Sequence, residues 1–202
     1  MVTLVIVLVT SIFSVIAFSQ HSLVYKYQFN AYQIINRKQY SRLILHAFLH
    51  ANWTHLIVNM LVLYSFGTAL ERHFQQFFGS SWIPYYLILY FGAILVSPLY
   101  SLYKHRKDYH YNAIGASGAV SAVVFAAIFF DPWNKIYFFM MIPMPGIVFA
   151  VLYLVYSWLM SNRSKDNIAH DAHFFGAVFG FLLPIMLSPD LLTYFINQLL
   201  RR

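Results

Sequence analysis

Residues 2–18 read VTLVIVLVTSIFSVIAF, an apolar stretch without a single charged side chain. A helix rises about 1.5 Å per residue, so a stretch of this length is just long enough to cross the roughly 30 Å hydrocarbon layer of a bilayer. Further apolar stretches follow at about residues 49–70, 82–103, 113–130, 136–160 and 168–187. The sequence therefore predicts an all-α polytopic membrane protein, in which a bundle of six transmembrane helices forms one domain over residues 1–202.

The composition also favours a lipid environment. Hydrophobic residues make up 60% of the 202 residues and charged residues only 9%, whereas a soluble domain carries about 25% charged residues. The chain has no cysteine, which excludes disulfides, thiolate metal sites and cysteine nucleophiles. Its net charge is +7, but the basic residues lie in short gaps between the apolar stretches. We therefore expect membrane lipids with anionic headgroups as partners, and no nucleic acid.

The distribution of basic residues bears on the orientation in the membrane. Nine lie in the gaps after the odd-numbered stretches: Lys26, Arg37, Lys38, Arg42, Lys104, Arg106, Lys107, Arg163 and Lys165. Four follow the even-numbered stretches, on the opposite side of the membrane: Arg72, Lys135, Arg201 and Arg202. The excess of basic residues on cytoplasmic loops would place the odd-numbered gaps in the cytoplasm.

Few polar side chains lie within the apolar stretches, and each is a functional candidate because polar groups are costly in lipid. They are His46, His50, His55, Asn59, Ser117, Ser121, His170, Asp171 and His173. His55 and Asn59 are four residues apart and share one helix face, where they either join two helices or donate hydrogen bonds to a ligand. His46 and His50 have the same spacing, but their place near the membrane interface favours a structural role. No carboxylate completes a zinc site with them.

The segment Gly115-Ala116-Ser117-Gly118 opens the fourth apolar stretch. One interpretation is structural, because small residues let helices approach closely in membranes. The other follows from the position of Ser117 near a helix N-terminus, where free backbone N–H groups favour negative charge. A tetrahedral acyl intermediate carries such a charge, so Ser117 is a candidate nucleophile.

His173 lies in the sixth apolar stretch, one helical turn before Gly176. Gly176 and Gly180 form a G-x-x-x-G face of the kind that packs closely against another helix. If this face meets the serine segment with its own glycines, the imidazole of His173 comes within reach of the hydroxyl of Ser117. A histidine at that distance can take the proton of a serine nucleophile.

No residue stands out as a third catalytic member. Asp171 lies two residues before His173, about 200° around a helix, and cannot easily orient its ring. Asp166 lies in the preceding gap and is a weaker candidate. The residues therefore predict a Ser–His dyad that needs neither a metal nor an organic cofactor.

These motifs resemble those of the rhomboid intramembrane serine proteases. The similar segments are the serine motif at 115–118, the segment His55-Leu56-Ile57-Val58-Asn59, and Ala172-His173 followed by Gly176 and Gly180. They occur in the family's order, on the second, fourth and sixth apolar stretches. The resemblance covers nearly the whole chain and is to the minimal, six-helix bacterial type.

The resemblance implies a role for each residue. Ser117 is the nucleophile, and His173 is the general base that later protonates the leaving amine. The backbone N–H of Ser117 forms an oxyanion hole with the side chains of His55 and Asn59. The substrates are transmembrane proteins, which enter between helices past the fifth stretch and the loop at 162–167. The membrane is the inner membrane of a bacterium, with both termini in the cytoplasm, which is opposite to the orientation that the charge distribution favours.

Two positions depart from the family pattern. Many members carry Trp-Arg in the first loop, where this chain has Ser41-Arg42. Many also carry a tyrosine four residues after the serine, stacked on the histidine ring, where this chain has Ser121. We expect Arg42 to keep its contacts in the loop, and we expect Ser121 to leave less to hold His173 in place.

Two alternative functions are considered beside proteolysis. The first is a pseudoprotease that binds membrane proteins without cutting them, and the presence of both Ser117 and His173 argues against it. The second is a proton-coupled transporter that uses the histidines as a relay. A transporter predicts charged residues that face each other in the membrane, often within an internal repeat, and no repeat is visible in this sequence.

Overall fold

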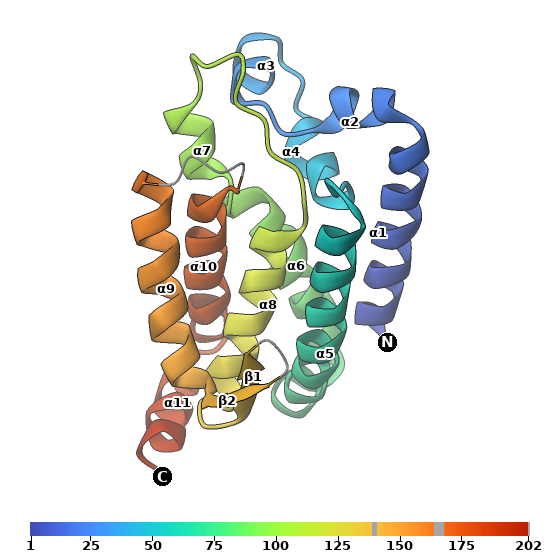
Figure 1. The fold of residues 1–202 in the computed structure, drawn as a ribbon. Helices are drawn as coiled ribbons and strands as arrows, with labels where there is room; N and C mark the ends of the chain where they lie inside the picture. The colour runs from blue at the N-terminus through green and yellow to red at the C-terminus, as the bar shows by residue number, and fades with distance from the viewer. Residues whose placement is uncertain (139–140, 164–167, 202) are drawn as a thin grey trace.

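The computed structural model describes residues 1–138, 141–163 and 168–201, and shows a bundle of long helices with short helices at one end (Figure 1). The long helices are α1 (Val2–Ser19), α5 (Trp53–Phe78), α6 (Trp82–Val96), α8 (Ser117–Phe130), α9 (Gly146–Arg163) and α10 (His170–Leu187). The shorter elements are α2 (His21–Tyr27), α3 (Ala31–Asn36), α4 (Arg42–Leu45), α7 (Leu99–Lys104), α11 (Asp190–Leu200), and 3-10 turns at His46–Phe48 and Gly79–Ser81. Strands β1 (Lys135–Phe138) and β2 (Ile142–Pro145) form an antiparallel hairpin.

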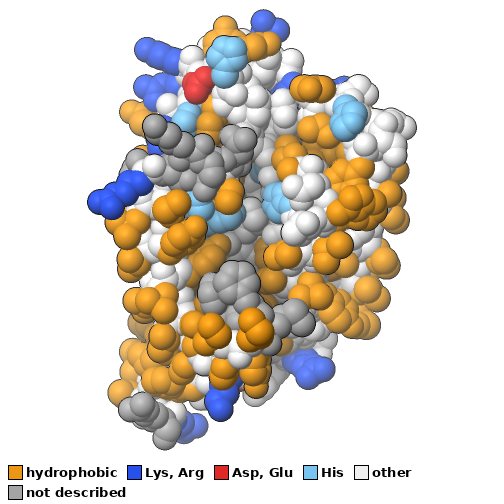
Figure 2. All heavy atoms as spheres, in the orientation of Figure 1, with side chains coloured by type: hydrophobic (Ala, Val, Ile, Leu, Met, Phe, Trp, Pro, Cys, Tyr) orange, Lys and Arg blue, Asp and Glu red, His pale blue; other side chains and the backbone are white. Residues whose placement is uncertain are grey.

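The described helices include several that suit a membrane. By length and composition, α1, α10 and the helical run from Trp53 to Lys104 can cross a bilayer, and α8 and α9 are shorter apolar helices. Hydrophobic side chains cover the middle of the face in Figure 2, whereas lysine and arginine gather toward its ends. A chain with several such helices is a multi-pass membrane protein, because helices satisfy their own backbone hydrogen bonds in lipid.

Helix α8 forms the centre of the bundle. It packs against α5, α6, α9 and α10, and every residue from Gly118 to Phe130 is buried. Its 14 residues span about 21 Å, which is less than the roughly 30 Å hydrocarbon layer. Because other helices enclose α8, its length does not have to match the lipid. The chain after α7 descends into the bundle before α8 begins (Figure 1), so the N-terminus of α8 lies inside the protein.

The fourth predicted span, at 113–130, was wrong at its start, because the helix begins only at Ser117. Ala113 exchanges two backbone hydrogen bonds with Phe29, at N···O distances of 2.8 and 3.1 Å. Gly115 has a φ of +122°, which a right-handed helix does not allow. The first residues of this apolar stretch are therefore extended rather than helical.

The fifth predicted span, at 136–160, is helical only in its later part. Its first residues belong to the β1–β2 hairpin, and α9 begins at Gly146. Pro143 and Pro145 lie in β2, where the missing N–H is tolerated better than inside a helix. The hairpin is small, and the fold is otherwise helical over the described residues, in agreement with the predicted all-α class. The predicted gating loop and Asp166 fall largely on residues 164–167, outside the described residues.

The second predicted span, at 49–70, is shifted toward the C-terminus. Helix α5 starts at Trp53 because the side-chain oxygen of Asn52 accepts the N–H of His55 at 2.8 Å and caps the helix. The helix continues past Glu71 to Phe78. Glu71 is buried, and its carboxylate accepts the backbone N–H of Thr3 at the start of α1, at 2.6 Å. A charged residue with such a partner does not end the helix.

The third predicted span, at 82–103, is interrupted at Ser97 and Pro98, where α6 gives way to α7. The sixth span, predicted at 168–187, is α10, which starts at His170. The first span, predicted at 2–18, is α1 and ends one residue later.

The short helices between α1 and α5 brace the segment that leads into α8. Asn30 is buried, and its Nδ2 donates to the carbonyl of Tyr109 at 2.8 Å. Arg42 is also buried, and its Nη1 donates to the carbonyl of Gln28 at 2.7 Å. Arg42 therefore holds the first loop together, although Ser41 stands beside it in place of a tryptophan.

Candidate active site

Ser117 and His173 lie next to each other at the ends of two packed helices. Ser117 is the first residue of α8, and His173 lies in the first turn of α10. Nε2 of His173 is 2.7 Å from Oγ of Ser117, although 56 positions separate the two residues in the chain. Both side chains are half-buried. At this distance the hydroxyl proton can pass to the imidazole as the oxygen attacks a carbonyl carbon.

Glycines bring α8 and α10 into backbone contact. A Cβ atom on Gly176 would overlap the carbonyl of Gly118, and one on Gly180 would overlap the backbone of Ala122. A side chain at either position would therefore push the helices apart. Gly118 also faces the break between α6 and α7, where an added Cβ would lie 2.7 Å from Cβ of Ser97.

Gly115 has different surroundings from those predicted. We placed it on the helix-packing face, but it precedes α8 and faces α5 instead. A Cβ atom on Gly115 would lie 2.7 Å from Cε1 of His55, and the φ of +122° strains any other residue. Its N–H donates to the carbonyl of His46 at 3.0 Å. Glycine at this position lets the chain pass the imidazole of His55 on its way to Ser117.

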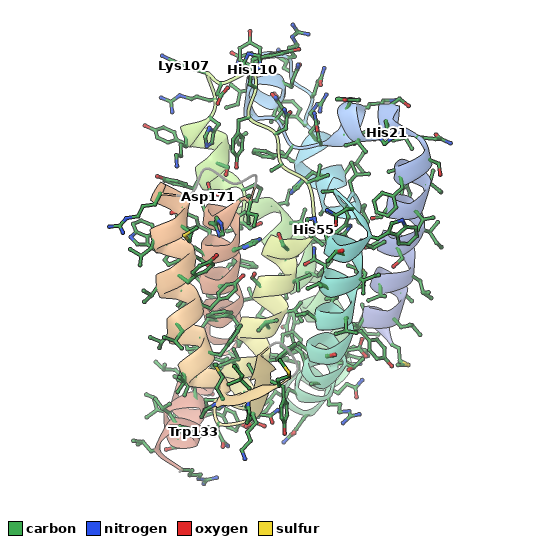
Figure 3. All side chains as sticks on the ribbon, viewed as in Figure 1. His21, His55, Lys107, His110, Trp133 and Asp171 are labelled. Carbon is green, nitrogen blue, oxygen red and sulfur yellow. The ribbon has the colours of Figure 1, made fainter. Side chains whose placement is uncertain are left out.

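His55 and Asn59 approach the serine segment from α5. Nδ2 of Asn59 is buried and has no hydrogen-bond partner among the described residues. It would lie 3.9 Å from a Cβ atom on Gly115. An unpaired buried donor costs about 1–3 kcal/mol and is rare in folded proteins. The Nδ2 group of Asn59 is therefore available to an acceptor that binds beside Ser117. Figure 3 shows that His55 lies near the start of α5.

His46 and His50 have structural partners. Nδ1 of His46 lies 2.9 Å from the carbonyl of Arg42. Nδ1 of His50 lies 2.9 Å from Oγ of Ser14 in α1, and that hydroxyl donates to the carbonyl of Phe48 at 2.8 Å. These contacts join the first loop to α1. Within residues 1–138, 141–163 and 168–201, no three metal-ligating side chains come together.

Asp171 is engaged in a second network, which ties α10 to α7. Its Oδ2 accepts the hydroxyl of Ser101 at 2.5 Å, and its Oδ1 accepts the N–H of Ala172 at 2.9 Å. Oγ of Ser101 also lies 3.2 Å from the hydroxyl of Tyr111, whose ring stacks on His105 with centroids 3.6 Å apart. Burial lowers the pKa of His105, which favours the neutral ring in this stack. Asp171 lies at the upper end of α10 in Figure 3.

One neighbour of His173 was not predicted from the sequence, namely Tyr153 in α9. The ring centroids of Tyr153 and His173 are 6.4 Å apart, and the ring planes are inclined by only 23°. The hydroxyl of Tyr153 lies 2.6 Å from Oγ of Ser121. We expected Ser121 to leave His173 with less support, but an aromatic ring from α9 lies beside the imidazole. No spacing relates Tyr153 to the three motifs, so only the packing of α9 reveals it.

Comparisons with known proteins point to one family. A family model described as the Rhomboid domain matches residues 37–190. The chain is 31% identical over 143 residues to RHOMBOID-like protein 12, mitochondrial, of Arabidopsis thaliana, a match that covers 67% of this chain and 43% of that protein. It is 26% identical over 170 residues to Rhomboid protease AarA of Providencia stuartii, covering 77% and 59%.

A third similar protein is Rhomboid protease GluP of Bacillus subtilis, with 29% identity over 146 residues, which covers 72% of this chain and 26% of that protein. The chain spans about half of the length of the Arabidopsis and Providencia relatives. The family model covers most of this chain and includes both Ser117 and His173. The chain therefore belongs to the rhomboid family.

Proposed function

We propose that this chain is an intramembrane serine endopeptidase, which cleaves transmembrane segments of other membrane proteins. The observation that carries the proposal is the 2.7 Å distance between Oγ of Ser117 and Nε2 of His173. The names of two relatives as rhomboid proteases support the same activity. The reaction needs no metal or organic cofactor, because each step uses side chains of this chain and water.

In the proposed reaction, Oγ of Ser117 attacks the carbonyl carbon of the scissile peptide bond while Nε2 of His173 accepts its proton. The carbonyl oxygen then carries negative charge, which the N–H of Ser117 and the side chains of His55 and Asn59 stabilise. The imidazolium of His173 protonates the leaving amine, and the peptide bond breaks. Water then hydrolyses the acyl-enzyme, with His173 again accepting a proton and returning it to Ser117.

A hollow on the surface of the protein supports the proposed proteolysis. Ser117 begins a short helix inside the bundle, and the face shown in Figure 2 is hollowed between α5 and the α9–α10 side, with histidine side chains on its walls. A substrate helix must unwind locally before its carbonyl can be attacked. Glycine destabilises a helix by about 1 kcal/mol relative to alanine, so we propose substrates with small or helix-breaking residues near the membrane boundary.

The number of membrane crossings is part of the proposal. We assign one crossing each to α1, α5, α6 with α7, α8, α9 and α10. Both termini lie toward the same end of the bundle in Figure 1, as an even number of crossings requires. Residence in a bacterial inner membrane stays a prediction, because the relatives include a mitochondrial and a bacterial protein. The orientation stays a prediction as well.

The proposed function is tested with purified protein in liposomes and a single-span substrate that carries small residues near its membrane boundary. We expect cleavage, and we expect a fluorophosphonate probe to modify Ser117, as identified by mass spectrometry of the labelled peptide. Substrate binding without cleavage or labelling would indicate a pseudoprotease. Labelling of another serine would contradict the assignment of the nucleophile, and proton flux without cleavage would favour the transporter.

The oxyanion hole leads to a prediction for Asn59. Asn59→Leu is expected to lower kcat by about 10²-fold, as loss of one oxyanion donor does, with little change in KM. Its thermal stability is expected not to fall, because Nδ2 of Asn59 has no hydrogen-bond partner in the described part of the chain. Asn197→Leu, on the exposed side of α11, is the matched control. Unchanged kcat together with a lower Tm would assign Asn59 to structure instead.

A further inference from the structure

We propose that Tyr153 of α9 is the positioning residue for the imidazole of His173, and that Ser121 anchors Tyr153 in that place. The inference rests on the proposed function, because it names the side chain that aligns the base of that reaction. Tyr153 itself touches neither Ser117 nor the scissile bond in this scheme, and acts through His173.

The hydroxyl of Tyr153 is anchored to the helix that carries the nucleophile. It lies 2.6 Å from Oγ of Ser121, and Ser121 is buried one helical turn after Ser117. The ring also contacts Phe125 of α8 and Phe149 of α9, at centroid distances of 5.5 and 5.6 Å. The hydrogen bond and these ring contacts fix the position of the phenol relative to α8.

The same phenol ring lies beside the base. A centroid distance of 6.4 Å and an angle of 23° fall within the range of offset-stacked aromatic pairs. A histidine ring turns about two side-chain torsions, and the contact of Nε2 with Ser117 does not by itself fix both of them. The acidic neighbour of His173, Asp171, is bonded to Ser101 and Ala172. Because the phenol ring of Tyr153 lies nearly parallel to the imidazole, it limits rotations of the imidazole that would move Nε2 of His173 away from Oγ of Ser117.

The side chains at 121 and 153 complement each other in size. Serine at position 121 is small enough to leave room for the phenol, and it supplies the hydrogen-bonding partner for the phenol oxygen. A large side chain at position 121 would occupy the same space from α8. The near-parallel ring beside His173 therefore comes from α9, a different helix from the one that carries Ser117, while His170 of α10 contacts the imidazole edge-on at a centroid distance of 5.9 Å.

Helix α9, which carries Tyr153, lies at the periphery of the bundle. Exposed apolar side chains cover much of its outer surface, among them Val151, Leu152 and Val155. Tyr156, one turn after Tyr153, makes a ring contact with His170 at a centroid distance of 5.6 Å. A displacement of α9 away from α8 would carry Tyr153 with it and release His173, so the alignment of the base depends on where α9 lies.

The test compares Tyr153→Leu with Tyr156→Leu, which is the same change on the same helix, in reconstituted protein. Tyr153→Leu is expected to lower kcat at least tenfold, roughly the scale of a small misplacement of a catalytic group, with KM within about twofold. Labelling of Ser117 by a fluorophosphonate, a probe too small to depend on entry of a substrate helix, is expected to slow by the same factor. Tyr156→Leu is expected to leave both rates within about twofold of wild type.

Restoring a ring from α8 separates positioning from general packing. The double variant Ser121→Tyr with Tyr153→Leu is expected to recover much of the lost kcat and labelling rate. A higher KM with unchanged kcat and labelling in Tyr153→Leu would overturn the proposal, because the residue would then act on the substrate. Wild-type rates in Tyr153→Leu would overturn it too.

If Tyr153→Leu does not fold, Tyr153→Phe and Ser121→Ala decide the question, since each removes only the hydroxyl anchor. Each is expected to lower kcat by roughly threefold to fivefold, the scale of one hydrogen bond, and the double variant no further than either single one. Additive losses, or no loss, would contradict the anchor. Failure of the proposed function is recognised separately, because wild-type protein would then neither cleave substrate nor take up the probe.

Discussion

Ser117→Ala is expected to reduce cleavage to background, a loss of roughly 10⁴- to 10⁶-fold in kcat by comparison with well-studied serine proteases. Removal of Oγ takes away the attacking atom, and the 2.7 Å contact with His173 disappears with it. His173→Ala is expected to cost nearly as much, because a serine hydroxyl is a weak nucleophile until its proton is accepted. The double variant is expected to be no slower than Ser117→Ala, since the two residues act as a unit.

The measurement is cleavage of the single-span substrate in liposomes, with Ser65→Ala and His21→Ala as matched controls. Both control side chains are exposed, on α5 and α2. His21 lies far from the start of α8, near the outer end of α1 in Figure 3. Equal cleavage by wild type, Ser117→Ala and His173→Ala would point to a contaminating protease or to a different nucleophile.

Gly176→Val is expected to abolish activity in a protein that still inserts into the membrane. Even one added carbon at this position overlaps the carbonyl of Gly118, and valine adds three. The helices must separate or slide, and His173, one turn before Gly176, moves away from Ser117. Misplacement of a catalytic group by about 1 Å can cost 10²-fold in rate, so a loss of at least that size is expected.

A graded series makes this result interpretable. Gly176→Ala adds a single carbon and is expected to lie between wild type and Gly176→Val in cleavage rate. Leu182→Val places a β-branched residue on the exposed side of the same helix and serves as the control. Membrane fractionation and size-exclusion profiles report insertion and folding. Full activity in Gly176→Val would show that close contact between α8 and α10 is not needed for the dyad.

The sequence predicted those parts of the fold that depend on local composition. α1 and α10 lie within two residues of their predicted limits, because apolar length alone decides whether a helix can cross lipid. The errors arise from contacts between distant residues. Glu71 looks like the end of a helix until Thr3, 68 positions away, supplies a donor for its carboxylate. Ala113 is extended because its backbone pairs with Phe29.

The candidate site shows the same difference between features that local sequence predicts and features that depend on distant contacts. The candidates Ser117, His173, His55 and Asn59 were predicted because each belongs to a short motif, and all four lie near the start of α8. Tyr153 belongs to no motif, and its contact with His173 depends on the packing of α9 against α10. Gly115 was expected at a helix–helix contact, but the φ of +122° and the nearby His55 ring follow only from the path of the loop.

The enclosed position of α8 has a consequence for the order of synthesis. Ser117 and His173, the proposed nucleophile and base, lie 56 positions apart, so at translation rates of about 5–20 residues per second they are made roughly 3 to 11 s apart. During this interval α8 lacks α10, the helix that covers much of its surface and brings the base. A nascent chain therefore holds only half of the proposed dyad, and its earlier helices share the bilayer with other proteins before the proposed protease is complete.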